Sequence, residues 1–375
     1  MLEKLKMDTK LFKEIDFSIL FATISIVLFG IINIYSTTKL SYGSFFAKKQ
    51  LIWFVGSLIV LYLILLWDYN LLENLVPIFY WISVVLLIYT KFNGATINGA
   101  TGWIRIGGFS MQASEFAKLA IILMLAKRLQ EMDLKINNLR NFMILTVYIL
   151  IPVGLIVIQP DMGMTMVCFF IVLGIFFCAG LDMKIIGGGL FSLVLGIIVV
   201  WNSGVIQDYQ KRRLTSFLNP EADELGSGLQ LLQSMIGIGS GGFFGTGLNL
   251  MEGSSPSYVS QFVPESQTDF IFAVIGEHWG TMGAIVLLIL YGILIYRFIV
   301  TARQAKDIFG SVICVGLSSY FLFGILQNIG MTIGLMPITG ITLPLVSYGG
   351  SSLLTTVMSI ALIMNIGMRK KKINF

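Results

Sequence analysis

Long runs of apolar residues, separated by short polar segments, dominate the pattern of this chain. Each run is about 17 to 33 residues long, and none alternates between apolar and polar positions as an amphipathic strand would. Because a helix needs about 20 apolar residues to cross a bilayer, each run predicts a membrane-spanning helix. The predicted spans cover residues 17–37, 51–67, 75–91, 113–130, 142–159, 163–180, 184–202, 267–299, 309–335 and 352–368.

Composition narrows the class of protein. Of the 375 residues, 56% are hydrophobic and only 12% are charged, whereas a soluble domain carries about 25% charged residues. A soluble or disordered protein is therefore excluded. The spans must be helical, because lipid offers no partner for unpaired backbone groups and a β-barrel would show alternating ten-residue segments. We expect an all-α polytopic membrane protein, with one integral-membrane domain over residues 1–375.

The basic residues predict the orientation. An even number of spans puts residues 1–16 and 369–375 on the same side, and the positive-inside rule makes both tails cytoplasmic. The long loop at 202–266 is then outside; it carries Lys211, Arg212 and Arg213, but long loops translocate largely regardless of charge. With this orientation the inner side holds 16 of the 25 basic residues: Lys4, Lys6, Lys10, Lys13, Lys127, Arg128, Lys135, Arg140, Lys184, Arg297, Arg303, Lys306 and Arg369–Lys372.

Metal-ligating residues are scarce. The chain has one His and three Cys, and Cys168, Cys178 and Cys314 all lie in apolar runs, where we expect them to be buried as small hydrophobic residues. A metal site built from imidazoles and thiolates is therefore not expected. The net charge of +5 forms no basic stripe, so membrane topology explains it better than nucleic-acid binding.

Polar residues gather at the outer ends of the spans instead. The first such patch is the glycine-containing segment 94–118, which we interpret as a loop that folds back toward the bundle and which carries Arg105. Glu115 and Lys118 share a face of the helix that follows. They form either an exposed ion pair that closes a helix end or part of a polar site at the outer mouth of the bundle.

Two further polar segments lie on the outer side. In the turn 159–163, Asp161 suits the N-cap of the next helix. In the long loop, Lys211–Arg213 suit an anionic partner such as a pyrophosphate, or lipid headgroups. The pattern Gly237-x-Gly239-x-x-Gly242 lacks a βαβ context and matches the dinucleotide fingerprint by chance. Its glycines allow the backbone to approach either a neighbouring helix or a ligand phosphate.

Acidic residues stand at the start of the eighth span. Ser266 and Asp269 resemble a capping box, and acids at a helix N-terminus are stabilised by the macrodipole. A helix over 269–300 would be about 48 Å long, against about 30 Å of hydrocarbon. It should therefore tilt or project, which places Asp269 at or just above the outer interface. The Pro- and Gly-containing segment 340–352 interrupts the helices before the last span, and such backbone is tolerated where it is buried or lines a cavity.

Five separated motifs lie in order along nearly the whole chain. They are GWIRIG at 102–107 with SEFAK at 114–118, QPDMG at 159–163, FLNPEAD at 217–223, PESQTDFIF at 264–272 and LPLVSYGGS at 343–351. Together they resemble the SEDS family (shape, elongation, division, sporulation). Family membership implies a ten-span bacterial membrane protein that polymerises lipid II into glycan strands. The stretch 209–233 resembles RodA, the elongation member, more than FtsW, the division member, although family members often carry a basic residue where this chain has Thr246.

The resemblance also implies roles for individual residues. It places the essential aspartate, a general base, at Asp269, and the acid–lysine pair of the fourth span at Glu115 and Lys118. The basic residues of the long loop fall on Arg212 and Arg213. With Glu115 and Lys118 they would bind the substrate, whose phosphates would rely on Arg105, Lys118 and Lys211–Arg213. No organic cofactor is needed, and no ligand cluster in the sequence demands a divalent cation, although one could assist the pyrophosphate.

The implied partners are lipid II, membrane lipid and a class B penicillin-binding transpeptidase, in the cytoplasmic (inner) membrane of a bacterium. Two other functions stay open from the sequence. A lipid-linked precursor flippase would place ionisable residues near the midplane, whereas the charges here lie at the outer face. A scaffold that only binds a transpeptidase is the other alternative.

Overall fold

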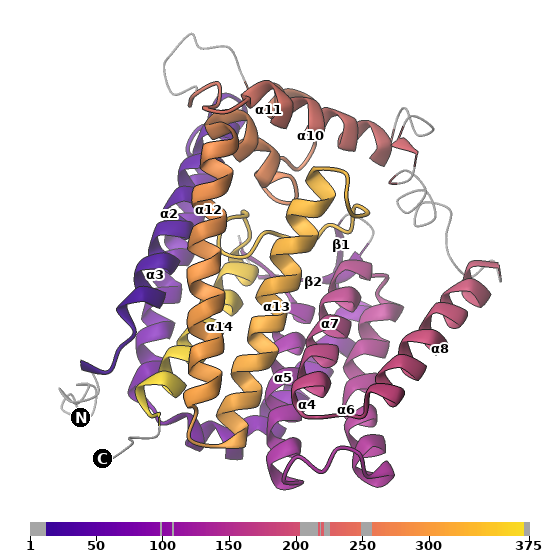
Figure 1. Cartoon of the computed structure of the whole chain (residues 1–375). Coiled ribbons are helices and arrows are strands. Elements are labelled where there is room, and N and C mark those ends of the chain that lie inside the picture. Colours follow the sequence, from indigo (N-terminus) through magenta and orange to yellow (C-terminus); the bar gives the residue numbers. More distant parts are fainter. Residues whose placement is uncertain are drawn as a thin grey trace.

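The computed structural model describes residues 13–97, 100–106, 109–202, 217, 219–220, 226–248 and 257–370. Long helices lie side by side in a bundle (Figure 1). We call the end that carries α10 (Ser227–Gly241) and α11 (Tyr258–Phe262) the upper end, and the end near the two termini the lower end. The bundle helices are α2 (Phe17–Tyr42), α3 (Phe45–Leu66), α4 (Tyr69–Asn93), α5 (Ala113–Glu131), α6 (Leu139–Ile158), α7 (Met162–Cys178), α8 (Met183–Asn202), α12 (Ile271–Gln304), α13 (Ile308–Thr332) and α14 (Gly350–Met368).

Each predicted apolar run coincides with one of these helices, so the predicted polytopic helical fold is confirmed. Within the described ranges, seven helices are long and apolar enough to cross a membrane: α2, α3, α4, α6, α12, α13 and α14. The described parts of α7 and α8 are shorter apolar helices. The remaining one, α5, spans 19 residues and carries ionisable side chains.

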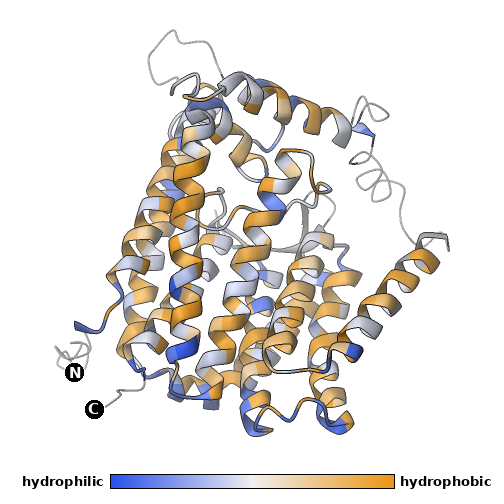
Figure 2. Cartoon of the chain, viewed as in Figure 1, coloured by the Kyte–Doolittle hydropathy of each residue, from blue (hydrophilic) through white to orange (hydrophobic). Residues whose placement is uncertain are grey.

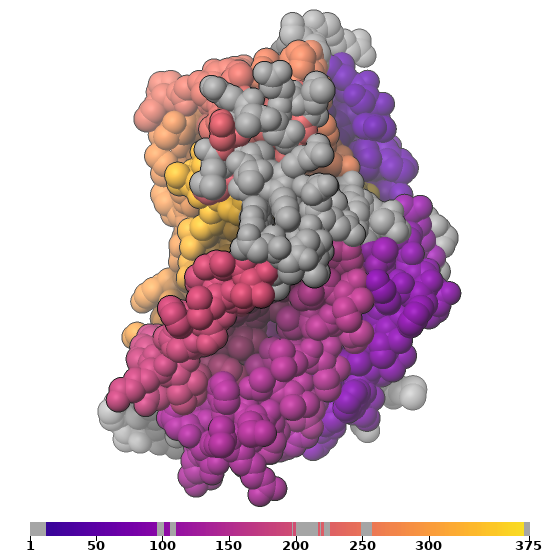
Figure 3. Space-filling model, turned by 90° about the vertical axis from the view of Figure 1, so that its right-hand side faces the viewer, coloured from indigo at the N-terminus to yellow at the C-terminus, as the bar shows by residue number. Residues whose placement is uncertain are grey.

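The helices differ in how deeply they are buried. In α14 and α13, 78% and 67% of the apolar stretch is buried, against 17% in α6. The side chains of α5 are also buried along most of its length. These three helices therefore form the centre of the bundle, and the apolar residues of the others cover its outside (Figure 2). Helix α8 leans away from the bundle (Figure 1) and lies across the face shown in Figure 3.

The cysteines follow the prediction only in part. Cys168 and Cys314 are buried, as expected, but Cys178 is exposed. It is the last residue of α7, where the helix has already reached the surface of the lower end. An apolar run alone does not show which of its positions face the protein and which face outward.

A small antiparallel sheet replaces the loop predicted for segment 94–118. Its strands are β1 (Ala95–Ile97), β2 (Ala100–Ile106) and β3 (Phe109–Gln112), in that order. The sequence signal was present, because Asn-Gly and Gly-Gly are typical of hairpin turns, and these dipeptides stand between the strands at 98–99 and 107–108. Thr101 N donates to Gln159 O at 3.4 Å, which ties the sheet to the turn between α6 and α7.

Helix α12 is broken at Gly280, whose φ of 62° and ψ of −160° are not helical. The glycine-rich loop after α10 supplies the missing hydrogen bonds. Thr246 N and Gly247 N donate to the carbonyls of Glu277 and His278 at 2.9 and 3.0 Å. In return, Thr281 N and Met282 N donate to the carbonyls of Gly242 and Phe243 at 3.0 and 3.1 Å. Of the two alternatives for these glycines, the structure shows close approach to a neighbouring helix.

Two glycines of this loop allow a direct test. Gly245 and Gly247 have φ values of +83° and +86°, so alanine is strained at both, by about 1–2 kcal/mol. A Cβ at Gly245 would also collide with the carbonyl of His278, whereas a Cβ at Gly247 meets no described atom within 4 Å. We therefore expect Gly245→Ala to lower the melting temperature of the purified protein clearly more than Gly247→Ala. Equal shifts would mean that the loop does not pack against the broken helix as described.

Candidate functional site

An irregular segment between α13 and α14, residues 333–349, enters the upper end of the bundle. Residues 341 and 343–347 are buried. Side chains of other helices form the hydrogen bonds that this backbone would form with itself in a helix. Gln50 Nε2 donates to Ser347 O at 3.0 Å, Tyr291 OH to Pro344 O at 2.5 Å and Gln327 Nε2 to Pro337 O at 2.8 Å. We call residues 333–349 the break segment. As expected, its irregular backbone is buried in protein.

Asp269 lies against the break segment. It is half-buried, in the turn 263–270 that precedes α12. Its carbonyl accepts a hydrogen bond of 2.8 Å from Asn328 Nδ2 of α13. Its Oδ2 atom lies 3.4 Å from the position that a Cβ on Gly340 would take. The carboxylate of Asp269 therefore faces the break segment at Gly340, whose φ of +72° favours glycine.

The predicted capping box is wrong. Helix α12 begins at Ile271, its N-cap is Phe270, and no side chain caps it. Ser266 Oγ instead lies 3.3 Å from Thr37 Oγ1 of α2. The pattern S-x-x-D describes a local turn, but here the tertiary contact with α2 engages the serine. The N-cap position of α12 is therefore occupied by Phe270 and not by Ser266.

Glu115 and Lys118 form an ion pair of 2.5 Å inside the bundle, where they are only 5% and 1% exposed. Of the two alternatives, an exposed ion pair is therefore excluded, because α14 and α13 cover this face of α5. Thr355 Oγ1 of α14 donates to Glu115 Oε2 at 2.8 Å, and the Lys118 ammonium lies 3.7 Å from the ring centre of Tyr320. Removing one partner of such a pair typically costs 3–5 kcal/mol, far more than for a surface pair.

A chain of polar side chains leads from this pair toward Asp269. Thr355 Oγ1 also approaches Ser352 O at 3.1 Å, and Ser352 Oγ lies 3.1 Å from Thr342 Oγ1 of the break segment. The neighbour of Thr342, Ile341, offers its carbonyl to the same Asn328 amide that holds Asp269, at 2.8 Å. We call Lys118, Glu115, Thr355, Ser352 and Thr342 the polar tract.

Asp161 joins the site from the turn between α6 and α7. As predicted, it caps α7, since Met164 N donates to its Oδ1 at 3.0 Å. Its other oxygen, Oδ2, accepts from Gln112 Nε2 at 2.8 Å and from Ser114 Oγ at 3.3 Å. Burial raises the pKa of Asp161 above its ordinary value, although these hydrogen bonds act in the opposite direction. The carboxylate thus links the end of the sheet to the start of α5.

The structure gathers some of the predicted site residues and leaves others apart. Asp269, Glu115 and Lys118 belong to one hydrogen-bonded region at the upper end. Arg105 is exposed on β2, where it pairs with Ser110 of β3. Arg212 and Arg213 lie outside the described residues. In the part of the chain that is described, no group of three His, Cys, Asp or Glu side chains could hold a metal ion.

Sequence reasoning missed the residues that connect the site. Asn328 and Thr355 are fully buried, yet they were passed over as members of apolar runs. The available signal was polarity within a span, because a polar side chain at membrane depth usually has a structural or functional partner. Gln327, Asn328, Thr355 and Thr356 all show this signal.

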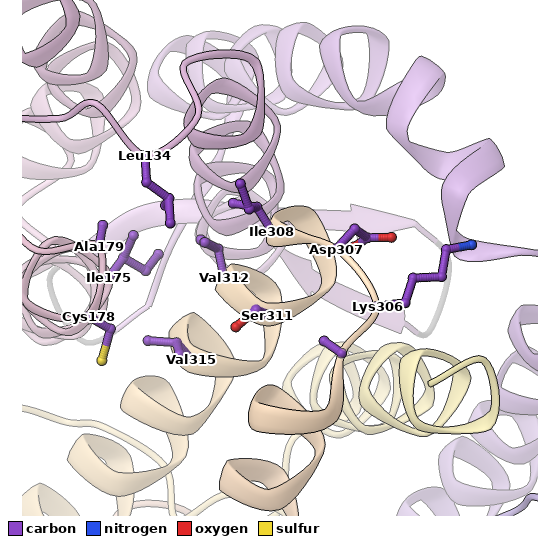
Figure 4. A pocket seen from close by; sticks show the side chains of 11 residues that line it. Leu134, Ile175, Cys178, Ala179, Lys306, Asp307, Ile308, Ser311, Val312 and Val315 are labelled. Atoms are coloured by element: carbon purple, nitrogen blue, oxygen red, sulfur yellow. The ribbon is translucent and has the colours of Figure 1, made fainter. Parts of the chain in front are cut away.

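A cavity of about 260 Å³ lies at the lower end, far from Asp269 along the bundle. Its lining is mainly apolar and comes from the end of α7 with Ala179, from the start of α13 with residues 305–307 before it, and from Leu134 (Figure 4). In Figure 4, Ile175, Val312 and Val315 surround it, while Lys306 and Asp307 point to one side. The candidate site is therefore the upper polar region and not this cavity.

Comparison with known proteins agrees with this architecture. The sequence profile of the FtsW/RodA/SpoVE family, described as cell cycle proteins, matches residues 14–372. The chain is 34% identical to the probable peptidoglycan glycosyltransferase FtsW of Trichlorobacter lovleyi, over 98% of this chain and 96% of that protein. It is 31% identical to the peptidoglycan glycosyltransferase RodA of Treponema pallidum, over 95% of this chain and 98% of that protein.

A solved structure extends the likeness to three dimensions. It comes from work on a peptidoglycan synthase complex that coordinates polymerization and crosslinking, and it matches with a TM-score of 0.81. The identity is 29%, over 94% of this chain and 97% of that chain. The match thus spans the whole bundle and not one motif. The chain belongs to the FtsW/RodA/SpoVE family.

Proposed function

We propose that this chain is a peptidoglycan glycosyltransferase that polymerises lipid II at the outer face of the cytoplasmic membrane, with Asp269 as the general base. The observation that carries the proposal is the place of Asp269. It is a half-buried carboxylate in the turn before α12, held against the break segment and close to the polar tract, whose Glu115, Lys118 and Thr355 are buried. The relatives named above as peptidoglycan glycosyltransferases support the reaction.

The reaction is a displacement at an anomeric carbon. The 4-hydroxyl oxygen of a GlcNAc unit forms a bond to C1 of a MurNAc unit on a second lipid-linked molecule. Asp269 takes the hydroxyl proton, and the bond from C1 to the pyrophosphate breaks with its electron pair leaving on undecaprenyl pyrophosphate. A positioned base of this kind typically contributes 10²–10⁴-fold to the rate. The apolar outer faces of the helices can hold the lipid tails.

The cations divide into two groups in this proposal. Lys118 is already paired with Glu115. In this proposal the pair binds the substrate as part of the polar tract. Arg105 is exposed in the sheet at the same end. We propose that Arg105, with Arg212 and Arg213 of the long loop, binds the pyrophosphate.

Asp269→Asn tests the base directly. Asparagine keeps the shape of the side chain and leaves the backbone contact to Asn328 in place, so the protein should fold and insert. We expect polymerisation of labelled lipid II by the purified variant to fall by about 10²- to 10⁴-fold. The matched control is Asp307→Asn, at the lower end, where the carboxylate caps α13 by accepting from Gly310 N at 2.7 Å. This control should keep most of the activity.

The same assay separates the alternatives. Near-parental polymerisation by Asp269→Asn would refute the assignment of the base. A parental protein that moves lipid II across vesicle membranes without forming polymer would be a flippase. A protein that does neither would act as a scaffold.

The solved complex that combines polymerization with crosslinking supports a class B penicillin-binding transpeptidase as the partner of this chain.

The proposed orientation puts the upper end outside and both termini in the cytoplasm. It is supported by the excess of basic residues on the terminal side, and by the ion pairs Arg297–Asp16 and Lys370–Glu14, which gather charges at the lower end. We expect an impermeant maleimide added to intact cells to label Ser227→Cys but not Asn137→Cys, in a Cys178→Ser background. Labelling of position 137 from outside would contradict the proposed orientation and place the lower end outside.

We further propose that the chain serves cell elongation, because its segment 209–233 resembles the elongation member of the family. If so, depletion in a rod-shaped host should produce rounded cells, since side-wall synthesis stops while division continues. Microscopy of depleted cells distinguishes the alternatives. Filaments would indicate a division role, and normal growth with defective spores would indicate a sporulation role.

A further inference from the structure

Asn328 occupies a special place beside the proposed base. It lies in α13, is fully buried, and donates from Nδ2 to two carbonyls at once. One is the carbonyl of Asp269, at 2.8 Å, and the other is that of Ile341 in the break segment, also at 2.8 Å. A single amide thus joins three segments that are distant in the sequence.

The orientation of this amide is set by its surroundings. Because two acceptors face the same end of the side chain, that end must be the NH₂ group. The other end, Oδ1, is buried and has no hydrogen-bond partner among the described residues. An unpaired buried acceptor typically costs 1–3 kcal/mol. An apolar residue of similar size would avoid this cost. The two hydrogen bonds that Asn328 donates must therefore give the protein an advantage that outweighs it.

What they contribute is the position of Asp269. Among the described residues, the turn 263–270 is held by two hydrogen bonds from the break segment and a third from α13. Tyr348 N donates to Gln267 O at 2.9 Å, and Ser347 Oγ donates to Thr268 O at 2.6 Å. The third comes from Asn328 and is the one among these that bonds to Asp269 itself. It also fixes Ile341, the neighbour of Gly340, which the Asp269 carboxylate faces.

We propose that Asn328 is a positioning residue for catalysis, which sets the distance between the Asp269 carboxylate and the break segment through two backbone carbonyls. The proposal rests on the function proposed above for Asp269. Without the amide, the turn would stay attached at Gln267 and Thr268, and Asp269 could shift. A shift of about 1 Å at a reacting group can cost 10²-fold in rate.

The chain offers a matched control in Asn365 of α14. This residue is also fully buried, and its Nδ2 also donates to two carbonyls, those of Ile64 and Trp67, near the lower end of the bundle. Asn328→Leu and Asn365→Leu each remove an amide that donates to two carbonyls. Asn365→Leu also removes the Oδ1 atom that accepts from Arg369 Nη1 at 2.6 Å, so it should lower the melting temperature at least as much as Asn328→Leu does.

Their kinetics should differ. For Asn328→Leu we expect kcat for lipid II polymerisation to fall about 10- to 100-fold with KM changed less than about threefold, because binding is kept and the base is misplaced. For Asn365→Leu we expect kcat within about threefold of the parent. Hydrogen–deuterium exchange should speed up in residues 263–270 of Asn328→Leu alone.

Each outcome decides the proposal. An unchanged kcat in Asn328→Leu, or an equal loss in both variants, would overturn it. If Asn328→Leu does not insert, Asn328→Thr keeps one donor and should show an intermediate loss of kcat. If the parent itself makes no polymer, the proposed function fails. The exchange data then still show whether Asn328 anchors the turn.

Discussion

Unpaired backbone groups are the constraint on which the rest of this structure depends. In a membrane, each buried carbonyl that leaves a helix must find a partner within the protein. The break segment exposes such carbonyls at the upper end, and side chains of α3, α12 and α13 bond to them. The presence of Gln50, Tyr291, Gln327 and Asn328 in otherwise apolar helices follows from this one need.

Backbone groups that are not bonded within a helix also need partners at the kink of α12. Gly280 frees the carbonyls of Glu277 and His278, and the glycine-rich loop after α10 bonds to them. Glu277 also holds the start of α11, because Val259 N and Ser257 Oγ donate to its carboxylate at 2.9 and 2.7 Å. Along the chain, Asp269 lies between α11 and the kink, so Glu277 joins the elements that precede and follow its turn.

The sequence predicts the helices well because length and apolarity are local properties of each run. It predicts the site less completely, because the contacts that build it join residues far apart in the chain, such as Glu115 with Thr355 and Asp269 with Asn328. The resemblance identified Asp269, Glu115 and Lys118, but no pattern of spacing showed that the pair is buried. The small sheet was missed because its strands are short, although two turn dipeptides mark it.

The charge balance of the site gives a last physical argument. Glu115 and Lys118 neutralise each other within 2.5 Å and are covered by α13 and α14, so together they bring no net positive charge to a departing pyrophosphate. A leaving group with several negative charges needs unpaired cations close to it, in a place where water is partly excluded. Arg105 is the described residue that the resemblance assigns to this role outside the buried pair, and it is exposed on the sheet. The proposed chemistry therefore relies on Arg105, together with Arg212 and Arg213, for the charge of the departing pyrophosphate.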